Sequence, residues 1–191
     1  MASNKAELII VYGRRRIGKT ELLKEAFKKR QAIYFVADLG ADQDQRRRLS
    51  EAIHRIYPNP LLEADPPPEW DPLLRYLVEI GKKERIILIL DEFPYICSSN
   101  PALPSILQRI WDEAGKNSKL YLILCGSFVS FMERDLGTKE PIIWSSNGTA
   151  SLTVFTHSNF KRIFSNILPR REDLGLCHTW RGASLSHPIL R

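Results

Sequence analysis

The segment Gly13-Arg14-Arg15-Arg16-Ile17-Gly18-Lys19-Thr20 combines two glycines, a lysine and a hydroxyl residue at a spacing suited to holding phosphate groups. It fits the pattern G-x-x-x-x-G-K-[ST], whose glycines let backbone N–H groups converge on phosphate oxygens at the start of a helix. In this pattern the lysine contacts the β- and γ-phosphates and the last hydroxyl lies on Mg²⁺. The sequence therefore predicts a site for ATP with Mg²⁺ that extends from Gly13 to Glu21, with Lys19 on the phosphates and Thr20 on the metal.

Two acidic residues follow the apolar run at residues 86–90, namely Asp91 and Glu92. An apolar strand that ends in two acids is a Walker B arrangement, in which the first acid holds the metal through its water shell and the second polarises the attacking water. We expect Asp91 in the first role and Glu92 in the second. The competing interpretation, two acids in a surface loop, is less favoured because a complete phosphate loop stands upstream.

Ser127 follows a further apolar run at residues 120–125. At this position it is a candidate sensor that touches the γ-phosphate or the attacking water. Ser127 is also suited to cap a following helix, and the two roles are compatible. Arg14, Arg15 and Arg16 occupy variable loop positions, where side chains point to solvent or contact a partner such as DNA.

The elements that must position these residues alternate along the chain. Four β-branched or apolar runs predict buried strands, and apolar residues at helical spacing predict helices between them. The expected strands are at residues 8–12, 32–37, 85–90 and 120–125, and the expected helices at 19–30, 45–56, 71–82 and 100–115. Weaker patterns predict a helix at 127–134, a strand at 150–155 and a helix at 159–167.

Strands that alternate with helices predict an α/β fold in three layers, with a parallel sheet covered by helices on both faces. We expect residues 1–155 to form a P-loop ATPase core and residues 156–191 a short helical or irregular segment that resembles an incomplete lid. The 191 residues suffice for one principal domain. No apolar run approaches the ~20 residues that cross a bilayer, and the N-terminus lacks a signal-peptide core, so we expect a cytoplasmic protein without membrane contact.

The net charge of +6 is concentrated near the N-terminus. Residues 1–50 hold 12 Lys and Arg against 6 Asp and Glu, whereas residues 51–191 hold 16 against 16. Such a basic region suits a polyanionic nucleotide and equally suits nucleic acid. The three cysteines, Cys97, Cys125 and Cys177, are widely spaced and predict neither a disulfide framework nor a zinc site.

The residues resemble the archaeal-type ATPase family, a P-loop group close to the AAA+ and STAND ATPases. The resemblance covers about residues 7–137 and is carried by residues 10–23, by Asp91-Glu92-Phe93-Pro94-Tyr95, and by residues 101–112 leading into 122–127. It implies ATP rather than GTP, in agreement with the lack of an Asn-Lys-x-Asp motif. It also implies a sheet in which the phosphate-loop strand and the Asp-Glu strand flank the strand before Ser127.

Two departures from the family pattern shape the expected activity. Family members usually carry an Arg-Glu pair and a helix before the first strand, whereas this chain has only residues 1–7 there. After the position of Pro141, family members usually carry a Tyr-Gly-Arg stretch and a helical lid, whereas this chain reads Ile142 to Gly148. We therefore expect a shortened relative that binds nucleotide better than it hydrolyses it, because no arginine is assigned to stabilise transition-state charge.

Three functions fit these residues. The favoured one is a slow Mg²⁺-dependent ATPase, with Glu92, Lys19 and Ser127 as catalytic residues and Thr20 and Asp91 at the metal. The alternative is a nucleotide-gated binding module in which ATP sets a conformation and the basic region contacts nucleic acid or a protein partner. A small-molecule kinase is a weaker third possibility, and a homo-oligomer in which one subunit supplies an arginine to the next is compatible with the first two.

Overall fold

The computed structural model describes residues 5–12, 15, 18–127 and 144–145, and the fold is built from these. In chain order the elements are β1 (Glu7–Tyr12), α1 (Lys19–Phe27), β2 (Ile33–Val36), α2 (Asp42–His54), η1 (Pro60–Glu63), α3 (Trp70–Lys83), β3 (Ile86–Asp91), α4 (Phe93–Ser99), α5 (Leu103–Glu113), η2 (Gly115–Asn117), β4 (Leu120–Gly126) and β5 (Trp144–Ser145). Within these ranges, no helix has both the length and the apolar character that a membrane span requires.

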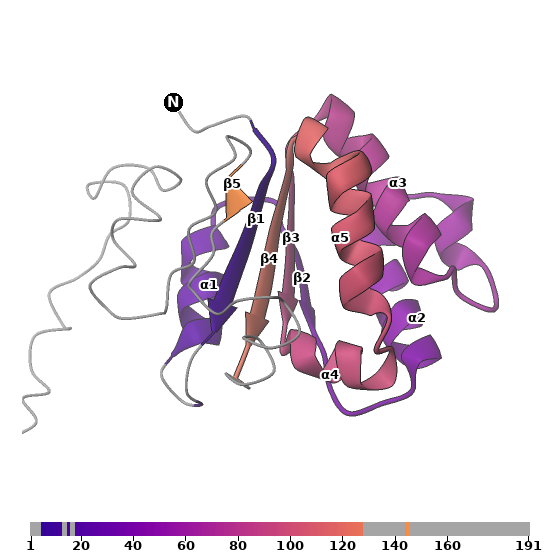
Figure 1. The fold of residues 1–191 in the computed structure, drawn as a ribbon, viewed down its shortest axis with the longest axis horizontal. Helices are drawn as coiled ribbons and strands as arrows, with labels where there is room; N and C mark the ends of the chain where they lie inside the picture. Colours follow the sequence, from indigo (N-terminus) through magenta and orange to yellow (C-terminus); the bar gives the residue numbers. More distant parts are fainter. Residues whose placement is uncertain (1–4, 13–14, 16–17, 128–143, 146–191) are drawn as a thin grey trace, which may run out of the picture.

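The strands form one sheet in the order β2-β3-β4-β1-β5 (Figure 1). The first four are parallel, and β3 and β1 flank β4, as the family resemblance implied. The short strand β5 runs antiparallel to β1, through the pairs Glu7–Ser145 and Leu8–Trp144, so the sheet is mixed at that edge. The three elements predicted at residues 127–134, 150–155 and 159–167 lie outside the described residues, Ser127 excepted.

Helices cover both faces of the sheet, and the predicted three-layer α/β arrangement is confirmed. Figure 1 shows α1 on one face and α2, α3, α4 and α5 on the other. Each face has its own core: Leu23 and Phe27 of α1 pack on the smaller one, and Trp70 and Leu77 of α3 pack on the larger one. Strands β3 and β4 are buried along their whole length because they are apolar on both faces, as expected for parallel strands between helical layers.

The sequence prediction missed one helix and shifted several boundaries. Helix α4 begins at Phe93, directly after the acidic pair, and has Pro94 in its first turn, where a proline is tolerated. Its seven residues are too few to show a helical period. Helix α1 ends at Phe27 rather than at residue 30, and α2 begins at Asp42 rather than at residue 45.

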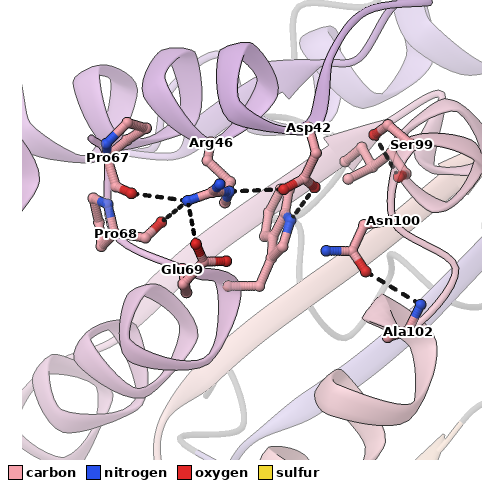
Figure 2. Close-up of polar contacts among 10 residues, drawn as sticks. Asp42, Arg46, Pro67, Pro68, Glu69, Ser99, Asn100 and Ala102 are labelled. Carbon is pink, nitrogen blue, oxygen red and sulfur yellow. Dashed lines mark hydrogen bonds and ion pairs between the residues drawn. The ribbon is translucent and has the colours of Figure 1, made fainter. Parts of the chain in front are cut away.

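The proline-rich connection before α3 is fastened to α2 by the Arg46 side chain, which is 9% exposed (Figure 2). Its Nε donates to Asp42 Oδ2 at 2.8 Å, and its Nη1 donates to the carbonyls of Pro67 and Pro68 at 2.8 and 3.1 Å. Glu69 lies 3.2 Å from the same nitrogen, and Asp42 also accepts a 2.7 Å bond from the Trp70 indole. A buried guanidinium with this set of acceptors holds an irregular segment in one place.

We expect Arg46→Ala to lower the free energy of unfolding by about 3 kcal/mol, because the substitution leaves buried acceptors without their donor. The matched control is Arg47→Ala on the same helix, because Arg47 pairs with Asp65 and the two side chains are 48% and 80% exposed. The control should change the free energy by less than about 0.5 kcal/mol. Urea denaturation of the two variants decides the point, and equal losses would contradict the proposed fastening.

Candidate functional site

The candidate site lies where three parallel strands end. Gly18 precedes α1 after β1, Asp91 is the last residue of β3, and Ser127 follows β4. Because β1 and β3 both neighbour β4, these three ends are adjacent at the carboxyl edge of the sheet. Crevices at this edge are where open α/β sheets bind their ligands.

The start of α1 has the backbone that a phosphate-binding loop requires. Gly18 has φ +84°, a left-handed backbone conformation that residues other than glycine adopt only at a cost in free energy. Lys19 and Thr20 follow it in the first turn of the helix. Helix α1 thus points its N-terminus, the positive end of its dipole, toward the edge of the sheet.

The other residues predicted for the phosphate loop are only partly placed. Arg15 is exposed, and its Nη2 donates to the Tyr95 hydroxyl at 3.0 Å, which ties the loop to α4. The Glu21 side chain is 81% exposed and pairs with Lys24 at 3.4 Å, so it points away from the edge. Four residues of the predicted loop lie outside the described residues: Gly13, Arg14, Arg16 and Ile17.

The Asp91 carboxylate is 2% exposed and is surrounded by donors. Its Oδ2 accepts hydrogen bonds from the hydroxyls of Thr20 and Tyr34 at 2.8 and 2.6 Å. Its Oδ1 accepts the backbone N–H of Glu92 at 2.9 Å. Burial raises the pKa of Asp91, but these and other hydrogen bonds, that of Tyr34 foremost, outweigh burial and bring the pKa below its usual value.

Lys19, Ser127 and Glu92 form a hydrogen-bonded chain across the site. The Lys19 ammonium, on a residue only 6% exposed, lies 3.4 Å from Ser127 Oγ. The Ser127 hydroxyl donates to Glu92 Oε1 at 2.9 Å. The three residues predicted to be catalytic therefore meet, although they come from three separate elements.

Glu92 occupies an unusual backbone conformation. It has φ 53° and ψ 39°, and it is the one non-glycine residue with positive φ in the part of the chain described. This conformation ends β3 and begins α4. Its second carboxylate oxygen, Oε2, is buried and has no hydrogen-bond partner among the described residues. A strained backbone and an unsatisfied carboxylate oxygen at one residue are features of functional sites.

The donor set fits Mg²⁺ bound together with a nucleotide. Thr20 and Asp91 offer hard oxygen atoms, which Mg²⁺ prefers as ligands. Within the described ranges, no cluster of three or more His, Cys, Asp or Glu residues could hold a metal ion. Mg²⁺ typically binds through one or two protein oxygens, with phosphates and water completing its shell. Thr20 and Asp91 suit that mode, because they provide an anchor rather than a complete cage.

Two comparisons with known proteins both point to ATPases. A family of ATPase domains found predominantly in Archaea matches residues 1–184. A solved structure, the Walker-type ATPase PABY2304 of Pyrococcus abyssi, superposes with a TM-score of 0.56 over 84% of this chain and 53% of the other, at 21% sequence identity. At that identity the likeness concerns the fold, and it confirms the α/β P-loop NTPase fold predicted from the sequence.

Two relatives in Methanocaldococcus jannaschii are uncharacterized proteins. MJECL04 is 34% identical over 163 residues, which is 85% of this chain and 34% of that protein. MJ0424 is 44% identical over 55 residues, which is 29% of this chain and 53% of that protein. The matched regions thus span about a third and about half of the two relatives.

Sequence reasoning did not assign Tyr34 to the site. It appeared only as part of an apolar strand, yet its hydroxyl makes the shortest hydrogen bond to Asp91. Burial and the Asp91 carboxylate raise the pKa of Tyr34, so the phenol is protonated and acts as the donor. The available signal was a single tyrosine in an apolar run, because the hydroxyl of a tyrosine that packs in a protein usually has a hydrogen-bond partner. Identifying that partner required the order of the strands.

The left-handed backbone of Glu92 predicts an unusual effect on stability. We expect Glu92→Gly to have a free energy of unfolding about 0.5–1 kcal/mol higher than Glu92→Ala, which loses the same hydrogen bond from Ser127, because relief of ~1–2 kcal/mol of strain exceeds the entropic cost of glycine. The matched control is the same pair of substitutions at Glu84 after α3, where φ is −135°. There the entropic cost stands alone and the glycine variant should be the less stable of the two. Chemical denaturation measures all four variants, and a Glu92→Gly variant no more stable than Glu92→Ala would refute the strain.

Proposed function

The chain belongs to the family of ATPase domains found predominantly in Archaea, and from that membership we propose that it binds ATP with Mg²⁺ and hydrolyses it slowly to ADP and phosphate. The observation that carries the proposal is the set of hydrogen bonds joining Thr20 to Asp91, and Lys19 through Ser127 to Glu92. These bonds bring the ends of three strands together with the residue types that phosphoryl transfer requires.

In the proposed complex the start of α1 binds the phosphates. The backbone N–H groups from Gly13 to Thr20 and the Lys19 ammonium contact the β- and γ-phosphate oxygens. Thr20 and Asp91 hold Mg²⁺, which when bound supplies positive charge that neutralises the phosphate oxygens. The other residues of the loop contribute backbone groups, and their side chains do not contact the phosphates. These residues are Arg14, Arg15, Arg16, Ile17 and Glu21.

Glu92 is the proposed general base. The Ser127 hydroxyl holds Oε1, and the unsatisfied Oε2 is available to accept a hydrogen bond from the attacking water. Ser127 also contacts Lys19, so it is placed to respond when Lys19 engages the γ-phosphate. We expect slow hydrolysis, because no arginine is assigned to stabilise the charge that develops in the transition state.

The nucleotide-gated module remains the second candidate, and one contact favours it. The bond between Arg15 and Tyr95 links the phosphate loop to α4, so nucleotide binding at the loop can displace a helix. The nucleic-acid partner has less support, because Arg46, Arg47 and Arg48 of the basic region form ion pairs with acids of this chain.

We also propose residues 1–155 as the nucleotide-binding core, residues 156–191 as a short C-terminal segment, and a cytoplasmic setting.

Lys19→Ala tests the phosphate site. We expect the affinity for Mg²⁺-ATP, measured by calorimetry, to fall about 100-fold, near the upper end of what hydrogen bonds to charged groups contribute. The matched control is Lys24→Ala on the exposed side of the same helix, which should bind like the wild type. If the wild type fails to bind Mg²⁺-ATP, or if Lys19→Ala binds equally well, the proposed site is wrong.

Glu92→Gln tests the base. The variant should retain Mg²⁺-ATP binding but release phosphate about 10²–10⁴-fold more slowly, the range that general bases contribute. Glu79→Gln is the control, because Glu79 pairs with Lys82 on the surface of α3. Unchanged phosphate release in Glu92→Gln would remove Glu92 from the mechanism. Binding without phosphate release in the wild type would favour the gated module over the ATPase.

A further inference from the structure

Two hydroxyl groups converge on one oxygen of Asp91. Thr20 reaches Oδ2 from α1 at 2.8 Å, and Tyr34 reaches the same atom from β2 at 2.6 Å. Thr20 belongs to the phosphate loop and is itself a proposed metal ligand. Tyr34 stands outside the loop, 14 positions further along the chain on the edge strand of the sheet.

The strand register explains how Tyr34 reaches the site. Strand β2 pairs with β3 so that Tyr34 lies beside Ile89 and Val36 lies beside Asp91. Ile89 packs in the core on the α1 face, and Asp91, two residues later, points to the same face. Tyr34 packs against that core too, and its long side chain extends one pair along the strand to meet the carboxylate.

We propose that Tyr34 is a positioning residue, whose hydroxyl fixes the Asp91 carboxylate in the orientation that binds the Mg²⁺ of the nucleotide complex. The inference rests on the proposed function. It adds a determinant of metal affinity that lies outside both the phosphate loop and the acidic pair.

The geometry gives Tyr34 a role that Thr20 and the Glu92 N–H do not fill, and the Cys125 thiol, which also hydrogen-bonds Asp91, is a weak donor. The Glu92 N–H holds Oδ1, so a donor on Oδ2 is needed to prevent the carboxylate from turning about its Cβ–Cγ bond. Thr20 donates to Oδ2, but in the proposed complex its oxygen would also bind the metal, and its position depends on the loop. Tyr34 is held by a strand and by the α1-face core, so it fixes Oδ2 whether or not nucleotide is bound.

Tyr34→Phe tests the inference by separating metal affinity from nucleotide affinity. Calorimetry with a non-hydrolysable ATP analogue gives one dissociation constant in EDTA and another in saturating Mg²⁺. The ratio of the EDTA value to the Mg²⁺ value measures how much the metal increases the affinity for nucleotide. We expect Tyr34→Phe to keep the EDTA value and to reduce the ratio about tenfold, the lower end for loss of a partner that orients a metal ligand. The EDTA value also verifies folding, since nucleotide binding requires the folded loop.

The matched control is Tyr76→Phe. The Tyr76 hydroxyl donates to the Tyr57 carbonyl at 3.1 Å on the opposite face of the sheet, so this variant also loses one partly buried tyrosine bond. Its ratio should equal that of the wild type. A reduced ratio in Tyr34→Phe alone supports the inference.

Two results would overturn the inference while leaving the proposed function intact. One is a wild-type ratio in Tyr34→Phe. The other is an equal loss of affinity with and without Mg²⁺, because Tyr34 would then support the fold rather than the metal. A wild type whose affinity does not increase with Mg²⁺, or that binds no nucleotide, would instead refute the proposed function itself.

Discussion

The buried carboxylate of Asp91 is the group on which the arrangement of the site depends. A charged side chain that is 2% exposed must be surrounded by donors, since an unpaired buried charge costs several kcal/mol. Its donors include Thr20 of α1, Tyr34 of β2 and the backbone where α4 begins. Each of these contacts requires a feature of the fold: β2 beside β3, α1 across the face of β3, and a helix that starts directly after the strand. The strand order thus supplies the donors that Asp91 needs, and the buried carboxylate in turn favours this strand order over arrangements that would leave it unpaired.

The sequence was sufficient to predict what short-range patterns encode. The apolar runs gave all four parallel strands to within one or two residues, because a strand buried on both faces is continuously apolar. The spacing of Gly13, Gly18, Lys19 and Thr20, and the acids after the third run, likewise identified the phosphate and metal residues of the proposed site. These features depend on neighbours within about ten residues.

What the sequence did not predict depends on partners far apart in the chain. Tyr34 and Asp91 are separated by 57 positions, and their contact follows only from the register of β2 on β3. The Arg46 contacts with the proline-rich segment arise in the same way, over 21 and 22 positions. Helix α4 was missed for a different reason: its seven residues follow a left-handed residue that no propensity favours, and tertiary contacts decide its start. The differences thus occur where long-range pairing overrides local pattern.

The two acids at the end of β3 show how backbone geometry separates neighbouring side chains into different roles. Along a regular strand, Asp91 and Glu92 would point to opposite faces, Asp91 toward α1 with Ile89 and Glu92 toward the core of α2 to α5 with Leu90. The left-handed conformation of Glu92 interrupts that alternation. Its carboxylate then meets the hydroxyl of Ser127, which follows β4 two residues after the α1-facing Cys125. In the ordinary β conformation the Glu92 side chain would instead face the side of the larger core. The strain at Glu92 is thus the geometric condition that brings both acids to one edge, as the proposed roles in binding a metal and a water require.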